Sequence, residues 1–406
     1  MPSGCIRTER SWTRLDGVDV LRGLAILFVL LNHVNIRLMQ AKLDYTKGLP
    51  NQLVSSLVWN GQFGVQIFFA ISGFLITSTT IRRWGAVSRI NVRDFYLLRF
   101  ARIAPLFLLL VGVLSVFHLA HVKHFVISQE NGGLGGAALA AFTFRVNVLE
   151  ARHGYLPGSW DILWSLSVEE MFYLFFPPVC RLLGRGKLLV VVLLGFVVLG
   201  PFGRTFLAHG NEIWREYSYL GGMDAIALGC LTALLVSRLR FSRPMLWILG
   251  GLGIATLIFS LGFSLRADAW GLGRNGLNMS ILAVGTCMVT ACTQQTKWMS
   301  PWVLLPFVKL GQRSYEVYLT HMFVVFALFE LFAVAGRPIS AVPALFILAI
   351  LMSGVLGEVV ARLYSEPMNR QLRKAWGDGA DRLGSAVSRA FVREKNSSPA
   401  PTSALE

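Results

Sequence analysis

Long apolar runs recur along the chain, and each is long enough to cross a lipid bilayer. A helix needs about 20 apolar residues to span roughly 30 Å of hydrocarbon. The first run, Val18 to Leu38, includes Arg22 and His33 and has no small-residue cleavage site, so we expect a retained helix and not a signal peptide. The pattern predicts about ten transmembrane helices, near residues 17–38, 60–80, 100–120, 162–182, 187–207, 218–237, 244–264, 277–294, 311–334 and 341–363, and one interfacial helix at 134–149.

The distribution of lysine and arginine residues predicts how this bundle is oriented in the membrane. Lysine and arginine residues lie at alternate ends of successive apolar runs, which is the positive-inside pattern of membrane proteins. Both termini are therefore expected to face the cytoplasm. The cations that support this orientation are Arg7, Arg10 and Arg14, then Arg82, Arg83, Arg89 and Arg93, then Arg181, Arg185 and Lys187, then Arg238, Arg240 and Arg243, and finally Arg370, Arg373 and Lys374.

The composition agrees with a membrane protein and changes the meaning of the net charge. Hydrophobic residues make up 54% of the 406 residues and charged residues 15%, whereas a soluble domain carries about 25% charged residues. The net charge of +16 lies at the ends of the apolar runs, so we expect the lipid bilayer, and not nucleic acid, as the partner of these cations. The predicted fold class is an all-α integral membrane protein.

Three regions follow from this pattern: a cytoplasmic N-terminal segment at 1–16, a transmembrane domain at 17–367 and a cytoplasmic tail at 368–406. The tail is polar and cannot bury a core, so we expect most of it to be disordered. Inside the domain, the helix predicted at 162–182 contains two adjacent glutamates and two adjacent prolines. We expect this helix to be broken or to be shielded from lipid by protein.

Polar residues inside the apolar runs are candidate functional residues, because a charge in hydrocarbon costs at least ~2.5 kcal/mol. Arg22 and His33 are eleven positions apart, which places them on one helical face about 16 Å apart along the axis. Arg22 is expected in the cytoplasmic half of the membrane and His33 toward the outer half. The pair could hold an anion at one end and transfer a proton at the other. A polar packing pair is the alternative.

Two further groups of charged residues lie near the membrane. Arg99 and Arg102 share one face at the cytoplasmic entry of the third helix, and paired guanidinium groups suit phosphate oxygens; ordinary anchoring of the helix is the alternative. Glu169 and Glu170 lie in an apolar segment at a depth comparable to His33. A carboxylate beside an imidazole makes a general-base unit, although a structural Glu–Arg pair is the alternative, and helical phase does not decide which glutamate points inward.

Several neighbouring residues are candidates for lining the same cavity. Ser314, Tyr318 and His321 share a helical face, and simple packing is the alternative. The three-residue spacing of His118, His121 and His124 spreads these side chains around a helix, so we expect no metal site there. The candidate cavity-lining residues are Trp164, Ser165, Glu170, Tyr173, Ser314, Tyr318 and His321.

Six short motifs occur in a fixed order between residue 15 and about residue 367. They are Leu21-Arg22-Gly-Leu-Ala-Ile with ten residues between Arg22 and His33, Gly64-Val-x-x-Phe-Phe-x-x-Ser72-Gly73-Phe74-Leu-Ile, Arg99-x-x-Arg102-Ile-x-Pro105, Trp164-Ser-Leu-x-x-Glu169-x-x-Phe-Tyr173, Gly311-x-x-Ser314-Tyr315-x-x-Tyr318-Leu-x-His321, and Glu366-Pro367. Together they resemble acyltransferase family 3, whose members are membrane-bound acyltransferases of bacterial surface sugars and related acceptors.

The resemblance implies an activity and roles for particular residues. It implies an acyl-CoA co-substrate bound from the cytoplasm, with no other cofactor, and a saccharide or glycolipid acceptor. It also implies His33 as catalytic base, Glu169 at the active centre, and Arg22, Arg99 and Arg102 as donor-binding residues. The hydrolase-like domain that some members carry after the membrane region is expected to be absent. The expected location is the inner (plasma) membrane.

The sequence therefore predicts direct transfer of an acyl group, acetyl being the commonest in the family, to a hydroxyl, with His33 as base and Glu169 as its partner. A transporter or flippase for a glycolipid or an acyl group is the main alternative, because buried charges along an inner-to-outer track suit that function equally. The absence of a detectable repeat and the presence of a base–acid pair count against it. A polyprenyl-phosphate glycosyltransferase is a third alternative, disfavoured because no acidic metal-binding motif is evident.

Overall fold

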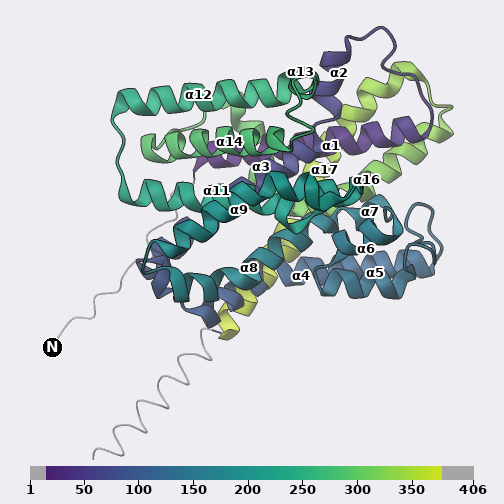
Figure 1. Cartoon of the computed structure of the whole chain (residues 1–406). Helices are drawn as coiled ribbons and strands as arrows, with labels where there is room; N and C mark the ends of the chain where they lie inside the picture. The colour runs from purple at the N-terminus through teal and green to yellow at the C-terminus, as the bar shows by residue number, and fades with distance from the viewer. Residues whose placement is uncertain (1–14, 377–406) are drawn as a thin grey trace, which may run out of the picture.

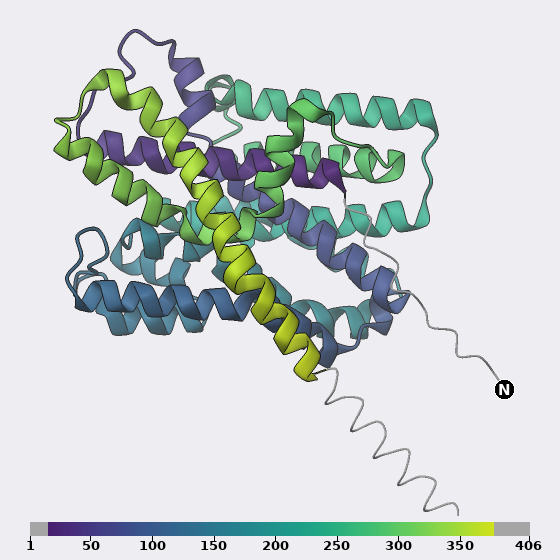
Figure 2. The ribbon, with the colours of Figure 1, turned by 180° about the vertical axis from the view of Figure 1, so that it is seen from behind.

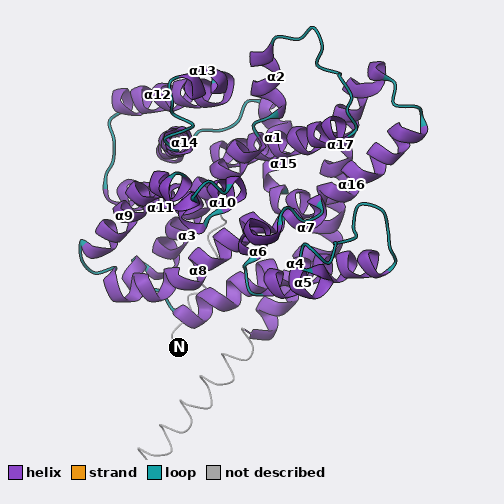
Figure 3. Ribbon diagram, turned by 45° about the vertical axis from the view of Figure 1, so that its right-hand side comes forward, coloured by secondary structure: helices purple, strands orange, loops and turns teal. Residues whose placement is uncertain are grey.

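The computed structural model describes residues 15–376, and these residues form helices joined by loops with no strand among them (Figure 3). The expectations for the segment at 1–14 and for the tail at 377–406 lie outside the described residues. Every predicted transmembrane segment contains a long helix. These helices are α1 (Asp16–Gln40), α3 (Gly61–Trp84), α4 (Val92–Leu119), α8 (Leu163–Leu183), α9 (Leu188–Arg204), α11 (Tyr219–Arg238), α12 (Arg243–Gly262), α14 (Leu277–Thr296), α16 (Ser314–Val334) and α17 (Val342–Val360).

Shorter helices join the long ones. The final helix continues past α17 through a π-helical turn at Ala361–Ser365 and remains helical to residue 376. In Figures 1 and 2 the start of α1 and the end of this final helix lie toward the same side of the bundle. The short helices are α2 (Asn51–Val58), α5 (Gly133–Phe142), α6 (Val146–His153), α7 (Gly158–Asp161), α10 (Glu212–Tyr217), α13 (Ser264–Ala269) and α15 (Leu305–Gln312).

The structure supports a multi-pass membrane protein, with a smaller count of spans than the sequence predicts. Among residues 15–376, eight helices are long and apolar enough to cross a membrane. The two predicted spans outside that set are α9, which has 17 residues, and α8, which carries two glutamates. A count of ten spans, with both termini in the cytoplasm, therefore stays a prediction.

One local prediction was wrong, and the either-or prediction for α8 holds in one of its two forms. The helix expected at 134–149 is two helices, α5 and α6, because Phe144 has a positive φ of 55° that ends the first one. The expected break in α8 is absent, since the helix runs through Pro177 and Pro178. A proline at 178 cannot donate to the carbonyl of Leu174, and the hydroxyl of Tyr96 donates to that carbonyl instead. Shielding by protein, the other expectation for this helix, holds for Glu170, which is 9% exposed.

Glycines allow α3 and α11 to pack closely at the centre of the bundle. A Cβ atom on Gly73 would lie 1.9 Å from the carbonyl oxygen of Ile226, and a Cβ atom on Gly229 would lie 1.9 Å from that of Ala70. No other residue type fits at either position, which is typical of helix contacts in membranes. The contact matters for the site, because Ser72 precedes Gly73 on α3.

We therefore expect Gly73→Ala to destabilise the protein. The methyl group would have to displace backbone atoms of α11, and such overpacking costs about 1–3 kcal/mol or more. The yield of monodisperse protein and the melting temperature in detergent measure the effect. Gly112→Ala in α4 is the matched control, because nothing lies within 4 Å of a Cβ atom there. Equal melting temperatures for the two variants would contradict the packing described.

Candidate functional site

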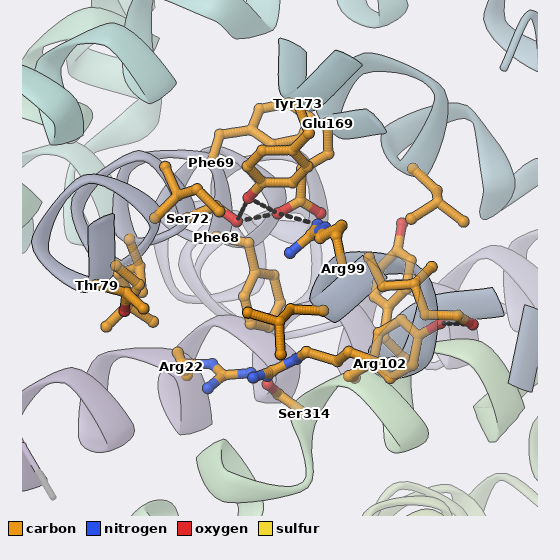
Figure 4. A pocket seen from close by; sticks show the side chains of 18 of the residues that line it. Arg22, Phe68, Phe69, Ser72, Thr79, Arg99, Arg102, Glu169, Tyr173 and Ser314 are labelled. Atoms are coloured by element: carbon orange, nitrogen blue, oxygen red, sulfur yellow. Dashed lines mark hydrogen bonds and ion pairs between the residues drawn. The ribbon is translucent and has the colours of Figure 1, made fainter. Parts of the chain in front are cut away.

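A cavity penetrates the bundle between α1, α3, α4, α8 and α16, and Figure 4 shows it from close by. One face of α3 forms a continuous wall, because Ser72, Ile76, Thr79 and Arg83 follow one another at helical spacing. The cavity thus extends from the middle of α3 to the end that the charge pattern assigns to the cytoplasm. The polar residues that line it are Arg22, Ser72, Thr79, Thr80, Arg83, Arg99, Arg102, Ser165, Glu169, Tyr173, Ser314, Tyr315, Tyr318 and Arg373.

Glu169 lies at the inner part of this cavity and holds two hydroxyl groups. The hydroxyl of Tyr173, one turn further along α8, donates to its Oε1 at 2.8 Å. The hydroxyl of Ser72 donates to the same oxygen from α3, and the Ser72 and Tyr173 hydroxyls are also in contact. The carboxylate therefore joins α3 to α8, as the dashed lines of Figure 4 show.

Arg99 decides which of the two adjacent glutamates faces the cavity. Its guanidinium pairs with Oε1 of Glu170, with Nη2 at 2.7 Å and Nε at 3.2 Å. The guanidinium also lies 3.6 Å from the ring centroid of Tyr173 and 3.8 Å from Oε1 of Glu169. Glu170 is thereby committed to α4, and Glu169 is the carboxylate that lines the cavity. Because Glu170 already neutralises the charge of Arg99, the geometry favours a role for Arg99 in positioning Glu169 and Tyr173.

Arg22 and Arg102 lie across the cavity from Glu169. Figure 4 shows their side chains approaching one another near Ser314, and the two guanidinium groups repel each other electrostatically. Neither makes an ion pair with a carboxylate of the described part of the chain. Unpaired cations that line a cavity suit an anionic ligand.

His33 lies beyond the cavity and contacts a second histidine. Its Nδ1 is 2.9 Å from the carbonyl oxygen of Val29 and 3.3 Å from Nε2 of His321. A carbonyl oxygen can only accept, so we assign the proton of the neutral ring to Nδ1 of His33. The Nδ1 of His321 lies 2.6 Å from the carbonyl oxygen of Tyr318 and is protonated by the same reasoning. Nε2 of His33 is then left with a lone pair, as a general base requires.

No direct contact joins His33 to Glu169 in the described structure, and two hydroxyl groups lie between them. The ring of His321 packs beside that of Tyr318, with centroids 5.9 Å apart. The hydroxyl of Tyr318 is 2.6 Å from that of Ser165, which is one helical turn before Glu169. Contacts thus run from His33 to His321 and from Tyr318 to Ser165, whereas Ser165 and Glu169 are related only by one turn of α8. The direct His33–Glu169 unit stays a prediction.

The C-terminal end of α1 carries a further polar group. Arg37, one turn after His33, lies with its guanidinium 4.5 Å from the ring centroid of Phe326. Asp161 of α7, outside the candidate spans, is close enough to interact with this cation and accepts a hydrogen bond from the hydroxyl of Tyr217 at 3.1 Å. Burial raises the pKa of Asp161 to about 6. This group stands on the side of His33 that is opposite to the cavity.

The remaining candidate residues divide between the cavity and its surroundings. Ser165, Tyr173, Ser314 and Tyr318 line the cavity, as the sequence suggested. Trp164, Glu170 and His321 do not: Trp164 stacks on Tyr217 at 4.0 Å, and the other two contact Arg99 and His33. His118 accepts from the backbone N–H of Ile127, and His124 contacts Glu330. Sequence reasoning missed Arg83 and Arg373, which it counted only as cytoplasmic anchors.

Comparisons with known proteins assign the chain to a family. The family model described as "Acyltransferase domain" matches residues 15–358. The chain therefore belongs to this acyltransferase family, which confirms the resemblance. No solved structure matches the chain.

Two of its relatives are bacterial O-acetyltransferases. The peptidoglycan O-acetyltransferase OatA of Listeria monocytogenes is 27% identical over 338 residues, a match that covers 77% of this chain and 50% of the relative. The O-acetyltransferase OatA of Staphylococcus aureus is 24% identical over 378 residues, which covers 89% of this chain and 58% of the relative. The chain thus corresponds to little more than half the length of these relatives.

The two glutamates of α8 should respond differently to substitution. Glu170→Ala removes the carboxylate that accepts the hydrogen bonds of Arg99 and leaves only the longer 3.8 Å contact to Glu169; breaking a buried pair costs about 3–5 kcal/mol. Glu169→Gln keeps an oxygen that accepts from Ser72 and Tyr173, so its effect on the free energy of unfolding should stay below about 1.5 kcal/mol. Thermal unfolding in detergent compares the two variants. A greater loss of stability in Glu169→Gln would mean that their positions have been assigned in reverse.

Proposed function

We propose that the protein transfers an acyl group, most simply acetyl, from cytoplasmic acyl-CoA to a hydroxyl of a cell-envelope saccharide or glycolipid, in the inner (plasma) membrane. The single observation that carries the proposal is the order of groups along one path. Unpaired guanidinium groups lie at one end, a hydroxyl-bound carboxylate lies in the middle, and an imidazole with a free Nε2 lies at the other end. Family membership and the names of the relatives support acyl transfer and a saccharide acceptor.

The proposed reaction is direct. Nε2 of His33 removes the proton of the acceptor hydroxyl as the hydroxyl oxygen attacks the thioester carbonyl carbon. The bond from that carbon to sulfur breaks, the acyl group stays on the acceptor oxygen, and CoA leaves as the thiol after taking up a proton. Arg22 and Arg102 hold the donor and so contribute mainly proximity.

Glu169 acts as the partner of His33 through intervening groups. Its carboxylate fixes the hydroxyls of Ser72 and Tyr173 at the inner part of the cavity. One turn away, Ser165 fixes Tyr318, whose carbonyl holds His321 against His33. The negative charge of Glu169 would stabilise the imidazolium that forms during transfer, and it would do so across this short chain of groups.

Acyl transfer in membranes tests the proposal. Labelled acetyl-CoA is supplied to the cytoplasmic face, and label in envelope glycans is compared between the native protein and an equally abundant His33→Ala variant. We expect the variant to lose about 100- to 10,000-fold in rate, the usual contribution of a general base. His153→Ala is the control, because His153 is exposed on α6.

Each other outcome has a definite meaning. Equal labelling by native protein and His33→Ala would remove His33 as the base. Glycolipid or acyl-group movement that survives in His33→Ala, together with no transfer by either protein, would favour the transporter alternative. Trapping of an acylated protein when donor is supplied without acceptor would contradict direct transfer.

A further inference from the structure

Three guanidinium groups from distant parts of the chain meet at the mouth of the cavity. Arg83 lies in the last turn of α3, Arg102 lies in α4, and Arg373 lies in the last helical turns before residue 376. All three line the cavity. Arg373 is close enough to Arg83 and Arg102 for electrostatic repulsion between the cations. Within residues 15–376, none of the three makes an ion pair with a carboxylate.

Orientation in the membrane explains cations near a cytoplasmic end, but it does not explain their convergence. Arg89, Arg93 and Arg370 satisfy the positive-inside pattern equally well and do not line the cavity. Arg83, Arg102 and Arg373 instead face one space, and they are exposed enough to meet a ligand from water. Like charges that converge without counter-charges repel one another, so a polyanion between them would be bound favourably.

The distance from these cations to the inner part of the cavity matches a particular ligand. Ser72, which is bonded to Glu169, and Arg83 are eleven residues apart on α3, which corresponds to about 16 Å along the axis. In an extended acyl-CoA, the pantetheine arm between the thioester sulfur and the diphosphate is about as long as four or five extended residues, roughly 15 Å. An arm whose sulfur end lies at the level of Ser72, with the acyl group directed toward Tyr318 and His33, would therefore put the phosphates beside Arg83.

The wall between these two ends has the chemistry that such an arm needs. Leu75 and Ile76 offer apolar contact, and Thr79 and Thr80 offer hydroxyl groups for the two amides of the arm. Trp84 lines the mouth, with the guanidinium of Arg83 5.6 Å from its ring centroid. An aromatic ring beside cations suits a purine base attached to phosphates.

We propose that Arg83 and Arg373, acting with Arg102, form a subsite for the diphosphate and 3′-phosphate of the CoA donor, with Trp84 beside the adenine. The inference rests on the proposed function and deepens it by assigning the phosphate end of the donor. Arg373 lies after residue 358, where the match to the family model ends. The helical extension beyond α17 is thus part of the donor site and not only a membrane anchor.

Donor kinetics test the subsite with the full chain in lipid nanodiscs. Acetyl-CoA is compared with S-acetylpantetheine, which has the same thioester and arm but no phosphate. We expect Arg83→Ala and Arg373→Ala each to raise KM for acetyl-CoA about 10-fold or more, because each variant removes a charge-assisted hydrogen bond to phosphate. Neither variant should change kcat appreciably or alter KM for S-acetylpantetheine. Arg370→Ala, one turn earlier on the same helix and outside the cavity, should leave both donors unaffected.

Two results would overturn the proposal: unchanged KM for acetyl-CoA in both variants, or equal increases for the two donors. An anionic phospholipid headgroup presents the same chemistry, so nanodiscs with and without anionic lipid are compared. A KM effect that appears only with anionic lipid would assign the cations to lipid. Equilibrium binding of labelled CoA to the same proteins tests the phosphate subsite separately from the proposed acyl transfer. If no donor is turned over, weaker CoA binding in the variants still supports the subsite, and unchanged binding refutes it.

Discussion

The ion pair between Arg99 and Glu170 is the interaction on which the rest of the site depends. It holds Glu170 against Arg99 of α4, and so leaves Glu169 as the carboxylate that faces the cavity. The same guanidinium lies on the ring of Tyr173, whose hydroxyl donates to Glu169. Two charges in an apolar environment are costly to bury, and they are tolerated because each satisfies the other. The position of Glu169 is therefore well defined, and the reaction of a thioester requires well-positioned groups around it.

The path from the mouth of the cavity to His33 separates binding from proton transfer. Cations that lack carboxylate partners gather where a phosphate-bearing donor would enter, whereas His33 and His321 do not line this cavity. This separation suits an enzyme whose donor and acceptor approach from opposite sides of a membrane.

The sequence predicted the elements better than it predicted their contacts. Apolar length placed the long helices, and the spacing of Arg22 and His33 placed both on the inner face of α1. Helical phase could not choose between Glu169 and Glu170, because consecutive residues differ by about 100° and the choice depends on Arg99 of another helix. The continuity of α8 past Pro178 depends on Tyr96, far away in the chain. Arg83 and Arg373 were hidden among cytoplasmic anchors, because only the fold shows that they face one cavity.

The central claim is that the donor enters this cavity from the cytoplasmic side. Thr79 lines its wall between Arg83 and Ser72, so Thr79→Cys offers a direct test with a membrane-impermeant maleimide in inside-out and right-side-out vesicles, against the parent chain as background. We expect the maleimide to label the introduced cysteine in inside-out vesicles only, and we expect CoA to protect this cysteine from labelling. Labelling from the outer side, or labelling that CoA does not reduce, would contradict it.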